Sequence, residues 1–171
     1  PTTCTMNMCF SVNGRSDHLP VASLEFGPDG ALATAAPRHW DIPYAGSDPE
    51  NTRFLRLHAP KGASTHGTVV VIHGGYWKNA YGLGDAFGNA GVISLAPWFV
   101  DRGFGAVEIE YRRRDHEGGG WPGTNEDILS ALRCMQQLTE PECGLVPKGP
   151  GGATACQALC TAKIVLVGHS A

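Results

Sequence analysis

The hydrophobic and polar positions along the chain fall into distinct patterns that predict strands. Residues 68–72 (TVVVI) and 163–167 (KIVLV) are apolar nearly throughout, which is typical of strands buried on both faces of a parallel sheet. Residues 52–58 (TRFLRLH) alternate polar and apolar positions, and this pattern predicts a strand with one buried face. Residues 104–111 (FGAVEIEY) predict a further strand.

Two segments carry apolar residues at helical spacing. One covers residues 92–102, and Gly103 stands where a C-terminal cap belongs. The other is expected to begin at Thr124, whose side chain can accept hydrogen bonds from the backbone N–H groups of the first turn. Asp127 follows three residues later, as in a capping box. Pro141 is expected to end this second helix. Its apolar face is predicted to consist of Ile128, Ala131, Leu132, Met135 and Leu138.

The remaining segments are rich in Gly, Pro and polar residues. Residues 1–35 are expected to form an irregular N-terminal segment, with a possible hairpin of residues 21–26 and 31–35 around the turn sequence GPDG. Residues 37–51 contain three prolines and predict a loop. Residues 142–161, rich in Gly, Pro, Ala and Cys, predict a surface insertion before the last strand.

The order of these elements predicts an α/β fold. Strands separated by helices favour a mostly parallel sheet with flanking helices and right-handed crossovers. A length of 171 residues suits one domain, expected over residues 36–171. In such sheets the chemistry lies at the carboxyl ends of the strands, so residues that follow residues 72 and 167 are the first candidates.

Composition and charge exclude several classes of function. The net charge of −3 and the pI near 6.2 argue against a nucleic-acid or anionic-membrane partner. The basic run Arg112–Arg114 is followed at once by acidic residues, and we expect a solvated strand end there. No stretch approaches the ~20 apolar residues of a membrane helix, and the N-terminus has no signal-peptide pattern. We therefore expect a cytoplasmic protein.

The cysteines predict neither disulfides nor a metal site. They form no CxxC pair, no His stands at finger-like spacing, and a secretory context is absent. We expect reduced thiols, no metal and no organic cofactor. The six positions are Cys4, Cys9, Cys134, Cys143, Cys156 and Cys160.

Residues 168–171 (GHSA) match the first four positions of the motif G-x-S-x-G. In that motif a strained strand-to-helix turn lifts a serine hydroxyl into the open, and small neighbours let strand and helix pass closely. Ser170 is therefore the candidate nucleophile. The backbone N–H of Ala171 is a candidate donor to the oxygen that becomes negative when the hydroxyl adds to a carbonyl.

Residues 73–77 (HGGYW) follow the strand predicted at residues 68–72. Paired glycines let backbone N–H groups approach a substrate oxygen, so His73, Gly74, Gly75, Tyr76 and Trp77 are candidate oxyanion-hole residues. The alternative is a plain glycine turn. His73 is expected to brace the loop by hydrogen bonds. The two aromatic rings are expected either to form a wall for an aryl substrate or to pack the loop onto the core.

HGGYW followed downstream by GHSA resembles the esterases and lipases of the α/β-hydrolase superfamily. The form HGGYW is most similar to the kynurenine formamidase (arylformamidase) family, as are residues 42–44 (IPY) and 48–51 (DPEN). The resemblance spans about residues 40 to 171. It implies an α/β-hydrolase fold that is truncated after the nucleophile elbow, with Ser170 as nucleophile. In this fold the acid and base follow the serine, which places both beyond Ala171.

The resemblance also implies a reaction: hydrolysis of N-formyl-L-kynurenine to kynurenine and formate, with a small-molecule substrate as the partner and a homodimer as a possible assembly. One alternative is a carboxylesterase acting on small acyl or aryl esters. Another is a catalytically inactive hydrolase-like binding protein. Five other histidines are expected in surface loops or at strand ends and not as the base; these are His18, His39, His58, His66 and His116. His169 adjoins Ser170, but the elbow is expected to point its side chain away from the hydroxyl.

A truncated elbow predicts that this chain is the N-terminal part of a longer hydrolase, inactive by itself. We expect the intact mass of the natural protein to exceed 18.1 kDa, because the elbow requires a helix behind it and a base opposite. Mass spectrometry of the natural protein measures this directly, and a mass of 18.1 kDa would contradict the expectation.

Overall fold

The structure is a computed structural model, and it describes most of the chain from residue 39 onward. Before residue 39 it describes the backbone of four short strands only. The described residues are 3–4, 10–12, 15–17, 24–25, 39–58, 60, 62, 64, 66–83, 95–138 and 152–168.

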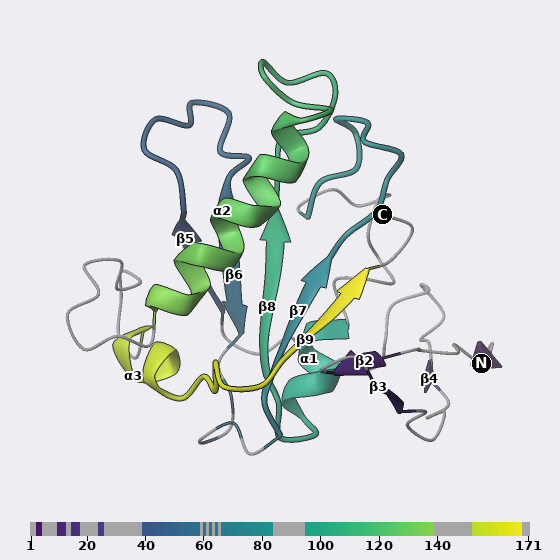
Figure 1. Ribbon diagram of the computed structural model, residues 1–171, viewed down its shortest axis with the longest axis vertical. Coiled ribbons are helices and arrows are strands. Elements are labelled where there is room, and N and C mark those ends of the chain that lie inside the picture. The colour runs from purple at the N-terminus through teal and green to yellow at the C-terminus, as the bar shows by residue number, and fades with distance from the viewer. Residues whose placement is uncertain are drawn as a thin grey trace.

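Within the described residues, five strands form the main sheet, in the order β5-β6-β8-β7-β9 (Figure 1). The strands β5 and β6 are antiparallel, as are β6 and β8, whereas β8, β7 and β9 run parallel. The sheet is therefore mixed, and its parallel part consists of β8, β7 and the edge strand β9. The strand bounds are His39–Pro43 (β5), Phe54–His58 (β6), Thr68–Ile72 (β7), Gly105–Glu110 (β8) and Ile164–Gly168 (β9).

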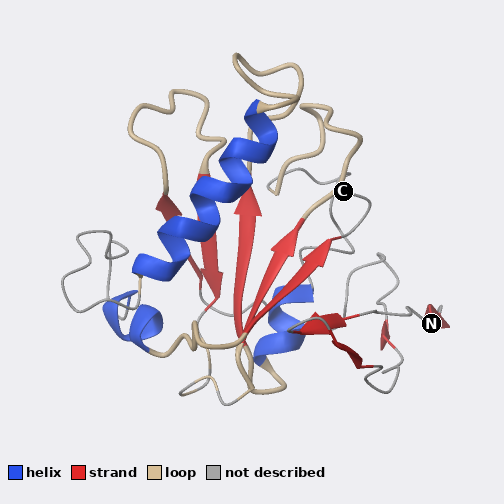
Figure 2. Cartoon of the chain, viewed as in Figure 1, coloured by secondary structure: helices blue, strands red, loops and turns tan. Residues whose placement is uncertain are grey.

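Helices cover both faces of this sheet (Figure 2). Helix α1 (Leu95–Val100) packs on one face, and helices α2 (Gly123–Gln137) and α3 (Gly152–Gln157) pack on the other. The architecture is thus α/β, as the order of elements predicts. None of the helices in the described ranges has the length and apolarity needed to cross a membrane.

Alternate residues of the central strands supply two hydrophobic cores. Val70, Val107 and Ile109 face α2 and α3, while Val69 and Val71 face α1. All five are fully buried, as the unalternating apolar runs predict, because a sheet covered on both sides leaves neither face to solvent.

The predicted strands at 52–58, 68–72, 104–111 and 163–167 are confirmed as β6, β7, β8 and β9. Helix α1 confirms the described part of the helix predicted over 92–102.

Gly103 ends α1 as predicted. Its φ of 82° lies in the left-handed region, its N–H donates to Val100 O at 3.1 Å, and the Phe104 N–H donates to Phe99 O at 3.1 Å. This pair of hydrogen bonds is the Schellman arrangement.

The N-terminal strands form two separate pairs. Thr3–Cys4 (β1) pairs with Leu24–Glu25 (β4), and Phe10–Val12 (β2) pairs with Arg15–Asp17 (β3). Of the hairpin predicted from residues 21–26 and 31–35, only β4 is described, and β4 pairs with β1. Its second predicted strand lies outside the described residues.

The prediction of a loop over residues 37–51 is wrong at its start, where β5 forms. Trp40 and Ile42 are buried while His39, Asp41 and Pro43 are exposed, so the segment has the alternation of a strand with one covered face. Pro43 is compatible with this because β5 is an edge strand, where a missing ladder donor is tolerated. The proline content concealed the alternation.

The predicted capping box at the start of α2 does not form. The N-cap position is Pro122 and makes no side-chain cap hydrogen bond. Thr124 instead accepts from the Gly120 N–H at 3.1 Å and donates to Arg112 O at 2.5 Å. Asp127 binds Arg112. Both side chains therefore bind the segment that precedes the helix, at Arg112 and Gly120, and do not cap the first turn of α2.

Three burial predictions also change. Residues 142–161 are not wholly a surface insertion, because α3 forms there and buries Ala155 and Cys156. Strand β6 is buried on both faces, not one, since His58 is buried against Glu108. Strand β9 is only half-buried, with Leu166 at 51% exposure.

The core should be sensitive to loss of volume at its centre. Leu55 in β6 is fully buried, so Leu55→Ala is expected to lower the free energy of unfolding by about 2–5 kcal/mol through lost burial and the cavity left behind. Leu129→Ala is the matched control, because Leu129 is 53% exposed on α2. Chemical denaturation measures both, and equal losses for the two variants would contradict the described core.

Candidate functional site

The strands that lead into the two candidate motifs are neighbours in the sheet. β7 and β9 are parallel and paired in register, with Ile72 opposite Gly168. Ile72 and Gly168 therefore end adjacent strands at the same level, where neighbouring strands lie about 4.8 Å apart. In the sequence, His73 and His169 are the residues that follow them. His169, Ser170 and Ala171 themselves lie outside the described residues.

The loop after β7, residues 73–83, holds a strained backbone. Gly75 has φ 121°, and the non-glycine residues Tyr76 and Trp77 have φ 55° and 56°. A Cβ at Gly75 would lie 2.5 Å from the Tyr81 Cβ, so this position requires glycine for space as well as for conformation. Such strain persists only where surrounding contacts enforce it, and it concentrates at functional sites.

The two aromatic residues of the loop behave differently. Trp77 is half-buried and packs against the core on the α2 face, and its carbonyl accepts from the Arg114 N–H at 3.0 Å. Tyr76 is 81% exposed. The packing interpretation therefore holds for Trp77, while the Tyr76 ring is left at the surface beside the glycines.

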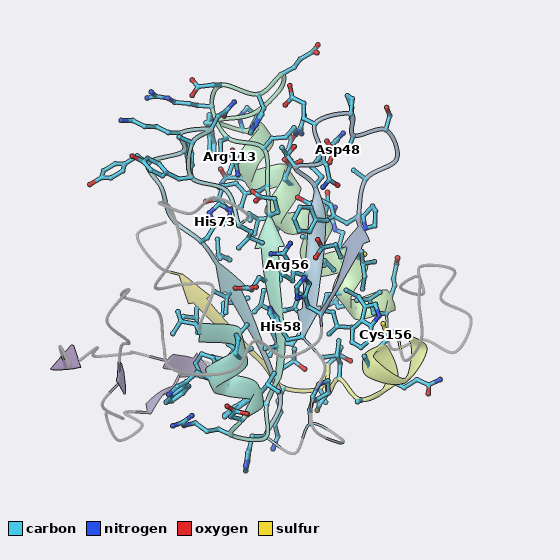
Figure 3. The ribbon with its side chains drawn as sticks, turned by 180° about the vertical axis from the view of Figure 1, so that it is seen from behind. Asp48, Arg56, His58, His73, Arg113 and Cys156 are labelled. Atoms are coloured by element: carbon cyan, nitrogen blue, oxygen red, sulfur yellow. The ribbon has the colours of Figure 1, made fainter. Side chains whose placement is uncertain are left out.

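A buried carboxylate, Glu110, lies beneath the 73–83 loop at the end of β8. It is 4% exposed. Its oxygens accept from His73 Nε2 at 3.1 Å, the Leu83 N–H at 2.6 Å, the Tyr111 N–H at 3.1 Å and Arg113 Nη1. Four donors on two oxygens satisfy the carboxylate well, which offsets the cost of burying its charge. Figure 3 shows His73 and Arg113 close together at this end of the sheet.

His73 is fully buried and is held on every side. Its Nδ1 lies 2.8 Å from Gly74 O and its Nε2 lies 3.1 Å from Glu110 Oε1. The Tyr111 ring stacks on the imidazole, with centroids 4.3 Å apart and planes 11° apart, and the Tyr111 hydroxyl donates to His73 O. These contacts confirm the predicted bracing role of His73.

The surroundings of Glu110 keep it ionised. Burial alone would raise the pKa of Glu110, but the hydrogen bond from His73, the charges of His73 and Arg113 and the Leu83 N–H together hold that pKa below its ordinary value. Burial, followed by the charge of Glu110, raises the pKa of Tyr111 to about 12. Tyr111 is therefore a hydrogen-bond donor at neutral pH.

The basic run Arg112–Arg114 is not a simple solvated strand end. Arg113 is buried against Glu110. Arg112 binds Asp127 at 2.8 and 2.9 Å, and that hydrogen bond raises the pKa of Arg112. Only Arg114, with its side chain 56% exposed, fits the prediction. The first two arginines turn inward because buried carboxylates from β8 and α2 lie within their reach.

The loop between β5 and β6 reaches the same edge of the sheet. Asp48 accepts from the Thr52 and Arg53 N–H groups at 2.8 and 2.6 Å. The Tyr44 hydroxyl donates to Glu110 O at 2.8 Å. Burial is the largest of the causes that raise the pKa of Tyr44. The segments 42–44 and 48–51 that contribute to the family resemblance therefore belong to the same end of the fold.

Sequence reasoning missed Glu110 and its neighbour Glu108. A signal was present, because the strand FGAVEIEY carries two carboxylates at alternate positions in an otherwise apolar run, and such residues are almost never fully buried unless paired. Glu108 is fully buried and lies 2.6 Å from His58 Nε2. His58 does end β6, as expected, but as a buried partner of Glu108.

The described part of the chain contains no group of three or more His, Cys, Asp or Glu side chains arranged to hold a metal ion. Cys134 and Cys156 are buried and Cys160 is half-buried, and none of these three described cysteines forms a disulfide.

Comparison of the chain with protein-family models, with curated proteins and with solved structures found no match. The resemblance to hydrolases therefore rests on the motif residues of the sequence.

The lowered pKa of Glu110 has a consequence for stability. An ionised Glu110 stabilises the fold above its ordinary pKa of 4.5, and this stabilisation is lost as the pH falls through the lower folded-state value. Glu110→Gln is thus expected to cost about 3–5 kcal/mol near neutral pH, and less as the pH falls below 4.5. Urea denaturation across this range measures the difference. Glu117→Gln, at an exposed position, is the control, expected within about 0.5 kcal/mol. A cost for Glu110→Gln that does not change with pH would contradict the charge assignment.

Proposed function

We propose that this chain carries the nucleophile and the oxyanion hole of a serine hydrolase of the α/β-hydrolase fold. The observation that carries the proposal is the register of β7 and β9, which starts the HGGYW and GHSA motifs side by side at the carboxyl edge of the sheet. A nucleophile and its oxyanion donors must frame the same carbonyl group, and neighbouring strand ends allow this.

Two features of the fold support the hydrolase form in particular. In α/β-hydrolases the glycine-rich oxyanion motif follows the third strand of the sheet, and β7 is the third strand of the main sheet in chain order. The nucleophile of that fold follows a strand at the top of the sheet, and in the sequence Ser170 follows the last residue of β9 by two positions.

In the proposed reaction the Ser170 hydroxyl attacks the formyl carbon of an N-formyl arylamine, with N-formyl-L-kynurenine as the substrate. The resemblance assigns the general base to a histidine that follows the serine in the natural protein. The N–H groups of Gly75, Tyr76 and Ala171 stabilise the oxyanion. The arylamine leaves with the proton from the base, and water then releases formate from Ser170.

The exposed Tyr76 ring supports an aromatic substrate. It lies directly beside Gly75 and is 81% exposed, so it can stack on an aryl group whose carbonyl is held by the loop. Stacked aromatic pairs contribute about 0.5–1.5 kcal/mol beyond the area that they bury.

A fluorophosphonate probe tests the nucleophile in the natural protein. We expect labelling of Ser170, identified by peptide mass, and none in Ser170→Ala. Ser130→Ala is the matched control, because Ser130 lies on α2 and bonds the Glu126 carbonyl of its own helix at 2.8 Å; it should label like the wild type. Absence of labelling in the wild type would favour an inactive binding protein over the proposed enzyme.

Turnover separates the formamidase from an esterase. We expect hydrolysis of N-formyl-L-kynurenine to exceed that of p-nitrophenyl acetate, measured as kcat/KM. Activity on the ester alone would reject the formamidase and leave a carboxylesterase.

A further inference from the structure

We propose that Glu110 is a positioning residue for the oxyanion hole, fixing the 73–83 loop at both ends and setting the direction of the Gly75 N–H through His73. This inference rests on the proposed hydrolase function and adds to it a residue that neither motif contains.

One carboxylate joins the start and the end of the loop. Glu110 Oε1 accepts from His73, the first residue after β7, and Glu110 Oε2 accepts from the Leu83 N–H ten residues later. The approach at the loop's end is close, because a Cβ at Gly82 would lie 2.9 Å from Glu110 Oε2 and 2.9 Å from Arg113 Nη1. The span of the loop is therefore set by the position of this carboxylate.

His73 transmits that position to the glycines. Its Nε2 is held by Glu110, and its Nδ1 lies 2.8 Å from Gly74 O, an acceptor, so Nδ1 donates. The peptide between Gly74 and Gly75 is planar and trans, so its N–H points opposite to its C=O. Holding the Gly74 carbonyl toward the buried imidazole therefore turns the Gly75 N–H away from it, outward from the core.

The imidazole has no freedom to rotate away. Tyr111 stacks on its face and donates to the His73 carbonyl. Arg113 donates to the same Glu110 oxygen, Oε1, that accepts from His73. Preorganised donors of this kind are effective because they need no reorganisation when charge develops on the substrate.

An uncharged isostere cannot replace the carboxylate. Glu110 receives hydrogen bonds from four donors, and the amide NH₂ of a glutamine would face some of these donors with donors of its own. Glu110→Gln is therefore expected to release one end of the loop while preserving the volume of the side chain.

Glu108 provides a matched control. It lies two residues earlier on β8, hence on the same face of the sheet, and it is fully buried and paired with a histidine, His58. Glu108→Gln removes an equivalent buried carboxylate without touching the 73–83 loop. General destabilisation should affect both variants, whereas loss of positioning should affect only Glu110→Gln.

The experiment measures kcat and KM in the natural protein for both variants. We expect Glu110→Gln to lower kcat by about 10- to 1,000-fold, the range up to that for losing one oxyanion donor. Its KM should change less than about threefold, since the donors act in the transition state. Glu108→Gln should keep kcat within about threefold of wild type. Equal kcat values for the two variants, or a loss confined to KM, would overturn the proposal.

A double variant tests the route through His73. If Glu110 acts through the imidazole, the loss of kcat in Glu110→Gln combined with His73→Asn should be smaller than the product of the two single losses, because the contact with His73 is already gone. Multiplying losses would overturn the relay. If Glu110→Gln does not fold, Glu110→Asp replaces it in the experiment, because Asp keeps the charge on a side chain that is one methylene shorter. The same loss of kcat is expected for Glu110→Asp.

Hydrogen exchange separates this inference from the proposed function. If the wild type hydrolyses neither substrate, the hydrolase proposal fails, and exchange of the backbone amides of residues 75–83 still reports the loop. Faster exchange there in Glu110→Gln than in Glu108→Gln supports positioning by Glu110. Equal exchange in the two variants overturns it.

Discussion

The arrangement of the chain where β7 and β8 end depends on one buried carboxylate. Glu110 ends β8 and receives hydrogen bonds from an imidazole, a guanidinium and two backbone N–H groups. A buried charge with fewer partners would cost several kcal/mol, so the four donors and the carboxylate require one another. Because those donors come from the end of β7, the end of its loop and the segment after β8, the requirement brings three parts of the chain to one place.

The strained loop depends on this anchoring. Left-handed backbone at Tyr76 and Trp77 costs of the order of 1–3 kcal/mol per residue. The Trp77 ring on the core, the Arg114 N–H on the Trp77 carbonyl and the His73–Glu110 contact hold the loop in that form. The exposed Tyr76 and the glycine backbone are thereby presented at the carboxyl edge of the sheet, beside the strand that leads to Ser170.

Much of the fold follows from local patterns. The apolar runs at 68–72 and 104–111 and the helical spacing after Thr124 identify β7, β8 and α2, because burial on both faces or along one stripe restricts the residue types allowed. The prolines of 37–51 and the Gly- and Ala-rich segment 142–161 misled the prediction. Strand β5 and helix α3 form there because partners elsewhere in the chain cover Trp40 and Cys156.

The sequence by itself determined the α/β class and the positions of the two motifs after predicted strands, because both depend on local periodicity. Only the tertiary structure decided that β9 lies beside β7, that Arg112 and Arg113 turn inward and that Glu110 holds the loop. The β7–β9 pairing joins residues 96 positions apart, and the arginine and histidine side chains bind carboxylates that lie between three and 37 positions away. Which partner a buried charge binds is decided by the packing of the strands and helices that carry both groups.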